Sequence, residues 1–128
     1  MTRSEPGARR RARSGPAPMP RQLVAQVADR FKALAEPSRL ELLQALRDGS
    51  ASVSELVART GLSQANVSKH LAVLLAAGFV SRRRQGLFVH YELADRDVLR
   101  LCEIMCGRLG RELDRRRQAV GSARRRVR

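Results

Sequence analysis

The sequence predicts a mainly α-helical fold with one small β-hairpin, and three observations lead to it. Apolar residues recur at intervals of three and four over most of residues 21–114, which is the period of a helix with one buried face. Only residues 79–83 and 87–93 read as short strands, and a glycine stands between them. The 128 residues have room for one domain with a modest single core.

Two helices are predicted before residue 50. The first runs from about Leu23 to Ala35, and Pro37 then suits the first turn of the second, where the missing N–H of proline is harmless. Asp48-Gly49 ends the second helix. The expected buried faces are Leu23, Val24, Val27, Phe31 and Leu34 on the first helix, and Leu40, Leu43 and Leu46 on the second.

A short helix, a tight turn and a longer helix follow. Ser52-Val53-Ser54-Glu55 has the form of a capping box, in which serine and glutamate side chains satisfy free backbone N–H groups. Thr60-Gly61-Leu62-Ser63 combines a glycine suited to a left-handed helix end with a serine suited to capping the next helix. That helix runs from about Gln64 to Ala77 and closes at Gly78. Two helices joined by so short a turn predict a helix-turn-helix.

Residues 79–83 and 87–93 are predicted to form a hairpin, or wing, whose turn is Arg84-Gln85-Gly86, because glycine permits a positive φ. Asp95 can then cap a last helix. The apolar stripe of this helix consists of Val98, Leu101, Cys102, Met105, Leu109 and Leu113. A small core cannot cover so long a stripe, so a partner helix is expected. The fold class is therefore a winged helix-turn-helix, with four helices, two strands and a fifth helix in chain order.

The formal net charge of +14 favours a polyanionic partner, because clustered Lys and Arg release the counterions of phosphates. Residues 1–20 hold five Arg, one Glu and four of the five prolines, which predicts a disordered basic arm; Met19 is a candidate initiator residue. Residues 115–128 hold seven Arg and no acid, and are predicted as a flexible Arg-rich tail. The predicted domain, residues 21–114, carries only +3, so recognition of DNA must be argued from its motifs.

Several protein classes are excluded by what the sequence lacks. No apolar run approaches the roughly 18 residues of a membrane span, and the basic N-terminus lacks the apolar segment of a secretory signal. Cys102 and Cys106 are the only cysteines, so no disulfide framework is expected. No nucleophile elbow, phosphate-binding loop or acid–base pair argues for an enzyme. We expect a soluble, cytoplasmic, nucleoid-associated protein without enzymatic activity.

The helix of residues 64–77 offers a polar face to a DNA groove. Its apolar residues Val67, Leu71 and Leu74 cluster on one side, which leaves the other side available. Gln and Asn pair with adenine, Ser and Lys contact bases or phosphates, and a small Ala meets a thymine methyl. The candidate DNA contacts are Ser63, Gln64, Ala65, Asn66, Ser68, Lys69 and His70. The alternative is that these residues only solvate an exposed face.

Three consecutive arginines, Arg82, Arg83 and Arg84, are predicted at the tip of the hairpin. Their long cationic side chains can reach a phosphate ridge or the adjacent minor groove, and we include them among the candidate DNA contacts. Charges in this position also protect an edge strand from pairing with another chain. For His70 and His90, which have no second ligand at metal spacing, a hydrogen-bonding role is favoured.

Two segments resemble the ArsR/SmtB family of repressors: Phe31-Lys32-Ala33-Leu34-Ala35-Glu36-Pro37-Ser38-Arg39-Leu40 and Leu62-Ser63-Gln64-Ala65-Asn66-Val67-Ser68-Lys69-His70-Leu71. Val89-His90-Tyr91-Glu92-Leu93, after Gly86, is similar to the wing of that family. The resemblance covers roughly residues 21–114. It implies a homodimer, joined through the first and last helices, that binds a palindromic operator in double-stranded DNA and releases it when an inducer binds.

The resemblance also bears on metal sensing. Metal-sensing members often carry Cys-x-Cys in the third helix or Asp and His pairs along the last, whereas residues 53–60 hold no cysteine and the last helix no histidine. Cys102 and Cys106 are neighbours on one helix face, and dimer symmetry can bring four thiols together. They are candidate ligands for a soft metal or metalloid ion, or a redox or persulfide switch. Inert packing in the apolar stripe is the alternative.

Two other functions remain open beside a repressor released by an inducer. A non-inducible repressor would have the same DNA contacts and two inert cysteines. A nonspecific nucleic-acid-binding protein would use its Arg-rich ends on any polyanion. The sequence assigns no cofactor other than the candidate soft ion.

Overall fold

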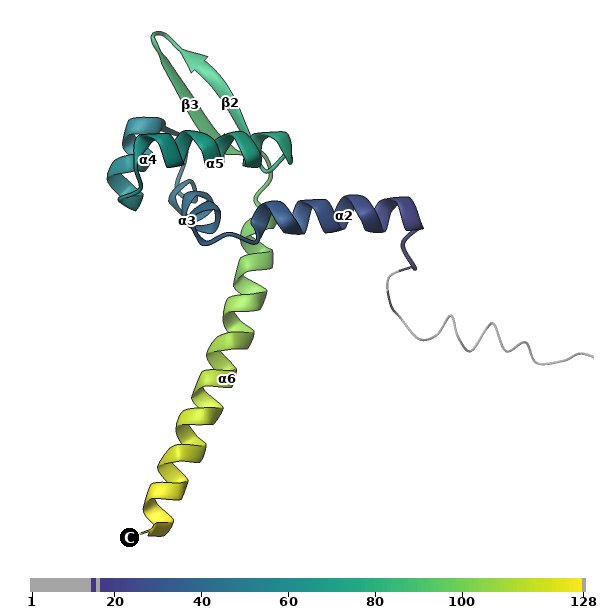
Figure 1. Ribbon diagram of the computed structural model, residues 1–128, viewed down its shortest axis with the longest axis vertical. Coiled ribbons are helices and arrows are strands. Elements are labelled where there is room, and N and C mark those ends of the chain that lie inside the picture. The colour runs from purple at the N-terminus through teal and green to yellow at the C-terminus, as the bar shows by residue number, and fades with distance from the viewer. Residues whose placement is uncertain (1–14, 16, 128) are drawn as a thin grey trace, which may run out of the picture.

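The computed structural model describes residue 15 and residues 17–127. Most of the predicted N-terminal arm, residues 1–14 and 16, therefore lies outside the described residues, as does residue 128. A small helical body carries a β-hairpin at one end, and a single long helix leaves the body in the other direction (Figure 1). In the described part of the chain no helix is long and apolar enough to cross a membrane.

The elements follow the predicted order, with one addition. They are α2 (Arg21–Leu34), α3 (Pro37–Ala45), β1 (Ala51–Ser52), α4 (Val53–Thr60), α5 (Gln64–Ala76), β2 (Val80–Gln85), β3 (Phe88–Leu93) and α6 (Asp97–Val127). The predicted fold class, mainly α-helical with a β-hairpin, is confirmed. The addition is β1, which pairs antiparallel with β3 and makes a sheet of order β1-β3-β2. A strand of two residues is too short to show alternation in the sequence.

The core is shared by all five described helices, with α3, α4 and α5 at its centre. The prediction for α3 is wrong in one detail: Leu40 is 36% exposed, and Leu42 is completely buried in its place. Leucines point to several sides of this short helix, so their spacing alone does not select the buried face. The largest fully buried side chains are Leu42, Leu43, Leu46, Leu56, Leu71, Leu74 and Val67.

The hairpin turn begins two residues later than predicted, although Gly86 belongs to it in both cases. Gln85 and Phe88 are the last pair of the β2–β3 register, so the turn is Gly86-Leu87. Gly86 has φ +64° at the first central position, which is where a type II′ turn takes glycine. Arg84 therefore lies inside β2, opposite Val89, and the prediction that it begins the turn is wrong.

The last helix is much longer than predicted. Its start agrees with expectation, because Asp95 Oδ1 accepts a hydrogen bond of 2.9 Å from the N–H of Asp97. The expected end was near residue 114, but α6 continues without a break to Val127. The segment predicted as a flexible tail is therefore helical. Arginine is a strong helix former and residues 115–127 contain no proline, so helix propensity continues where the apolar stripe thins out.

Candidate nucleic-acid interface

Hydrogen bonds within the chain fix the start of α5. Ser63 Oγ accepts a bond of 3.1 Å from the N–H of Asn66 and so caps the helix as predicted. Gly61 ends α4 with φ +77°, a left-handed conformation that costs glycine little. Just before Gly61, Thr60 Oγ1 donates to the carbonyl of Leu56 at 2.7 Å and accepts from the N–H of Leu62 at 3.3 Å. The turn that aims α5 is thus held by three side-chain bonds and one glycine.

The surface of α5 is divided into two faces. Val67, Leu71 and Leu74 are completely buried, so the apolar side is committed to the core. The opposite side has no large apolar residue and reaches solvent through the first two turns. The sequence-predicted residues exposed there are Ser63, Gln64, Ala65, Asn66, Ser68 and Lys69.

His70 lies apart from this group. Only 12% of its side chain is exposed, and its Nε2 atom lies 3.7 Å from Glu36 Oε2. Glu36 also caps α3, since the same carboxylate oxygen accepts a 3.0 Å bond from the N–H of Arg39. His70 therefore lies between α5 and the start of α3, apart from the exposed residues at the beginning of α5.

The three wing arginines are exposed but not equivalent. Arg83 lies on one face of the hairpin with Glu92, and the Nη2 and Oε2 atoms of the pair are 3.5 Å apart. Arg82 and Arg84 alternate with it along β2 and lie on the other face, opposite Tyr91 and Val89. No ion pair involves either of them within the described residues. All three arginines were predicted as candidate contacts, and two of them, Arg82 and Arg84, have no acidic partner within the described residues.

Two exposed apolar residues at the hairpin tip were missed. Leu87 is 96% exposed in the turn, and Phe88 beside it is also exposed. Leu87 was predicted in the strand because the turn was expected at Arg84-Gln85-Gly86, whereas Phe88 does lie in β3 as predicted. Apolar side chains at the end of an arginine-bearing hairpin can contact sugars in a minor groove.

The two cysteines lie on the exposed length of α6. Cys102 is partly exposed and Cys106 is exposed. Within the described residues, no group of three or more His, Cys, Asp or Glu side chains could hold a metal ion. In that part of the chain, Cys102 and Cys106 therefore have no third side chain beside them that could complete a metal site.

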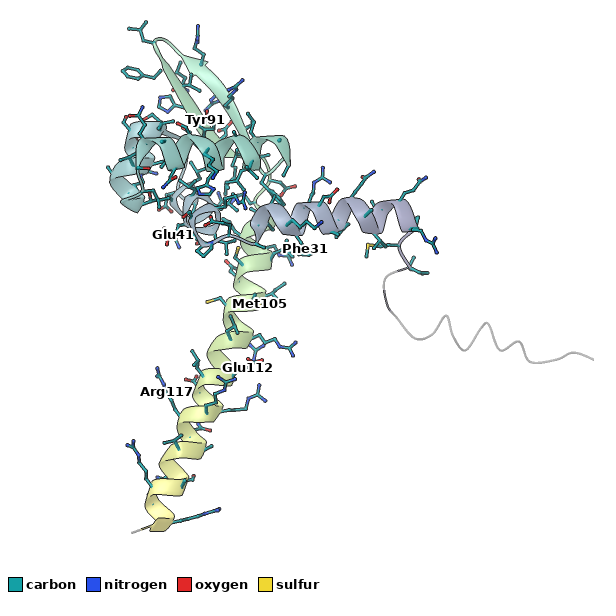
Figure 2. The ribbon with its side chains drawn as sticks, viewed as in Figure 1. Phe31, Glu41, Tyr91, Met105, Glu112 and Arg117 are labelled. Atoms are coloured by element: carbon teal, nitrogen blue, oxygen red, sulfur yellow. The ribbon has the colours of Figure 1, made fainter. Side chains whose placement is uncertain are left out.

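Helices α2 and α6 present apolar side chains that the described chain does not cover. A cleft of about 170 Å³ between them is lined by Phe31 and Leu34 of α2 and by Phe79 and Leu101. Met105 and Glu112 project from α6 below this junction, as Figure 2 shows. The exposed large apolar residues of the two helices are Leu23, Val24, Phe31, Leu101, Ile104, Met105, Leu109, Leu113 and Val120.

The sequence of the chain is similar to those of known transcriptional regulators. Residues 36–82 match the family described as "Bacterial regulatory protein, arsR family". The chain is 39% identical over 90 residues to the HTH-type transcriptional regulator KmtR of Mycobacterium tuberculosis, which covers 70% of this chain and 69% of that protein. The residues matched by the family model include the helix-turn-helix and the first half of β2.

Solved structures agree with the sequence matches. The crystal structure of Rv0081 of M. tuberculosis has a TM-score of 0.66 at 37% identity, covering 73% of this chain and 95% of that one. The solution structure of Mb0332 from Mycobacterium bovis has the same TM-score at 32% identity, covering 78% and 93% of the two chains. The Mb0332 fragment is described as a homodimeric winged helix-turn-helix DNA-binding domain.

Proposed function

The chain belongs to the ArsR/SmtB family of winged helix-turn-helix transcriptional regulators, and from that premise we propose that it is a homodimeric repressor with a palindromic operator. An inducer releases it from that operator. The observation that carries the proposal is the two-faced α5, whose apolar side is fully buried while its polar N-terminal side is open. A helix capped after a short turn and exposed in this way is the element that reads the major groove in helix-turn-helix proteins.

The proposed base contacts come from the first two turns of α5. Gln64 and Asn66 suit adenine, Ser68 suits a base or a phosphate, and Lys69 suits a phosphate or guanine. Arg82 and Arg84 supply phosphate contacts from the wing, with Arg83 in a lesser role because of Glu92. We leave His70 out of the contact set, since its side chain is turned to Glu36.

A dimer is supported by the uncovered apolar faces of α2 and α6 and by the homodimeric state of the Mb0332 relative. Two copies related by a two-fold axis place two α5 helices in successive major grooves on one side of the duplex, about one helical turn apart. The wings then contact the flanking backbone. A two-fold symmetric protein predicts an operator that is an imperfect palindrome.

Substitutions in α5 and in the wing test this division of roles. Gln64→Ala and Ser68→Ala should change which base is preferred at one position of each half-site, with a loss of roughly tenfold for the original base. Arg84→Ala should weaken binding to all duplexes and reduce the salt slope by about one. Binding isotherms on operator and randomised duplexes at several salt concentrations measure both effects.

The matched control is Gln44→Ala, which removes an exposed glutamine from α3, outside α5 and the wing. It should leave base preference and affinity unchanged. Equal affinities of the parent protein for operator and random duplexes would contradict a repressor and favour the nonspecific alternative.

Release by thiol chemistry at Cys102 and Cys106 is part of the proposal. It is favoured by the position of the two side chains on one face of α6, where Cys102 is partly exposed and Cys106 is exposed in the single chain. A second copy would supply two more thiols, and soft metals, arsenite and persulfides react with thiolates. Cys102→Ser with Cys106→Ser should abolish release from DNA by such agents. If the double variant is released as the parent is, the cysteines are inert and the repressor is not induced through them.

A further inference from the structure

The last part of α6 differs in charge from the rest of the helix. Residues 97–114 hold three Arg and four acids, so their charges nearly cancel. Residues 115–127 hold six Arg and no acid. All six are exposed, and none takes part in an ion pair within the described residues. We call residues 115–127 the cationic rod; its arginines are Arg115, Arg116, Arg117, Arg124, Arg125 and Arg126.

The cationic rod lies far from the candidate interface of the same chain. A helix of 31 residues is about 46 Å long, and no residue of α6 between Arg100 and Arg126 is buried. The hairpin and the C-terminal end of α6 lie at opposite ends of the long axis of the molecule (Figure 1), and Arg117 projects from the far part of the helix (Figure 2). A duplex held by α5 and the wing is therefore out of reach of the rod in that copy.

The spacing of the arginines fits the backbone of a duplex. They form two clusters, 115–117 and 124–126, and nine residues separate corresponding members. Nine residues are two and a half turns, so corresponding members point to opposite sides of the helix, whereas Arg117 and Arg124, seven residues apart, share a face and are separated by about 10 Å along the axis, close to the major-groove width of about 12 Å. A helix seated at a groove can thus place one cluster on each bounding phosphate ridge. Because each cluster has three consecutive residues, its guanidinium groups point around the helix and are not confined to one face.

Other partners fit the cationic rod less well. A membrane-surface helix needs a broad apolar face, and Val120 is the one large apolar side chain between Arg115 and Arg126. Single-stranded nucleic acids are held by aromatic stacking, and residues 97–127 contain no aromatic residue. A parallel second copy of the rod would set like charges side by side. Charge density without an apolar or aromatic face suits the phosphates of a double helix.

We infer that the cationic rod is a second, sequence-independent surface for double-stranded DNA, able to hold another duplex while α5 is on the operator. The repressor would then bridge two segments of DNA. This goes beyond operator recognition and rests on the proposed function only because α5 loads the protein onto the first duplex.

A capture experiment with the full chain tests the bridge. Operator duplex is immobilised and saturated with protein, and a fluorescent 30-base-pair random duplex is added after washing. The parent protein should retain the second duplex in a strongly salt-dependent manner. The variant R124Q/R125Q/R126Q should retain at least fivefold less, with operator loading within twofold of the parent. Glutamine keeps helix propensity while removing charge.

Two matched variants separate the rod from general charge effects. R100Q/R108Q/R111Q removes three arginines from the charge-balanced part of the same helix and should change capture by less than twofold. R124K/R125K/R126K keeps the charge and should retain capture. Circular dichroism of each variant checks that α6 remains helical.

Failure of the inference is distinct from failure of the proposed function. Normal operator loading without capture of a second duplex would overturn the cationic rod as a DNA surface, as would equal capture by the parent and R124Q/R125Q/R126Q. Binding of the rod to phosphatidylserine vesicles with no captured duplex would also overturn it and assign a membrane surface instead. If the protein does not load on the operator, that result counts against the proposed function. Direct titration of the random duplex with the parent and with R124Q/R125Q/R126Q then decides the inference. A fivefold lower affinity of the variant supports it, and equal affinities overturn it.

Discussion

Gly61 ends α4 in a left-handed conformation, and the reason lies in the backbone. A Cβ atom built on this residue meets nothing within 4 Å, so space does not require glycine here. The φ of +77° does, because an L side chain in this region is strained. The residue is therefore a conformational requirement of the turn that aims α5.

Gly61→Ala should lower the free energy of unfolding by about 1 kcal/mol through backbone strain alone. Urea denaturation followed by circular dichroism measures it. Gly121→Ala is the matched control, since a Cβ there also meets nothing within 4 Å but the residue lies inside α6. That change should not lower stability and should raise helix content. Equal losses from both changes would show that strain at Gly61 is not the cause.

The role of a single residue could be predicted from the sequence where it depends only on the neighbouring residues in the chain. The capping residues Ser52 and Ser63 and the glycine at position 61 were predicted, because each acts within its own turn of the chain. The burial of Leu42 in place of Leu40 was not predicted, because contacts with other elements of the core decide it. The proximity of His70 to Glu36 also comes from another segment of the chain and cannot be deduced from spacing along α5. Tertiary contact cannot be deduced from spacing along one helix.

At the scale of elements, α4 depends on the capping box at its start. Ser52 Oγ accepts from the N–H of Glu55 at 3.2 Å, and Glu55 Oε1 accepts from the N–H of Ser52 at 3.2 Å. The pKa of Glu55 is lowered below its ordinary 4.5, first by that backbone bond, then by the Ser52 hydroxyl, and also by the charges of Arg59 and His90. The ionised carboxylate is thus favoured in the folded state.

A lowered pKa in the folded state gives stability that is present above the ordinary pKa and is lost as the pH falls through the lowered one. Glu55→Gln should therefore unfold at lower urea concentration than the parent at pH 7, and the gap should close as the pH falls below 4.5. Urea midpoints from pH 7 to pH 3 measure this. Glu41→Gln, an exposed glutamate on α3, should show a small gap that varies less with pH. A gap for Glu55→Gln that stays constant over the whole range would contradict the role of ionisation.

Elements were predicted best where the apolar period was long and its ends were marked. Pro37 at the start of α3 and Gly78 after α5 bound their helices within a residue or two of the prediction. The hairpin turn was displaced because register depends on which side chains of β3 face the core, including Tyr91 and Leu93. The end of α6 was not predicted correctly, because the helix continues through residues that have high helix propensity but make no contact with the core.

At the scale of the whole molecule, the uncovered faces of α2 and α6 predict that a second copy is required for function. Leu109→Lys places a charge in the middle of the α6 face, where Leu109 is 51% exposed in the single chain. The variant should sediment as a monomer at concentrations where the parent is a dimer. Its operator affinity should fall at least tenfold, because two half-sites are no longer bound together.

Leu87→Lys is the control for this prediction. It introduces the same charge at a leucine that is more exposed but lies at the tip of the wing. This variant should remain dimeric. A dimeric Leu109→Lys protein, or a monomeric Leu87→Lys protein, would contradict an interface built on α2 and α6.

Ser52 belongs to three structures at once. It is the last residue of β1, it pairs with His90 of the wing strand β3, and it caps α4. Ser52 therefore connects the helix-turn-helix directly to the wing, and we expect the two to move together as one unit. Under the proposed function, an inducer bound at α6 would therefore release the operator by changing the distance between these units in the two copies, and not by bending α5 against the wing. Operator binding by the proposed repressor then depends on whether the separation of the two α5 helices matches the separation of successive major grooves.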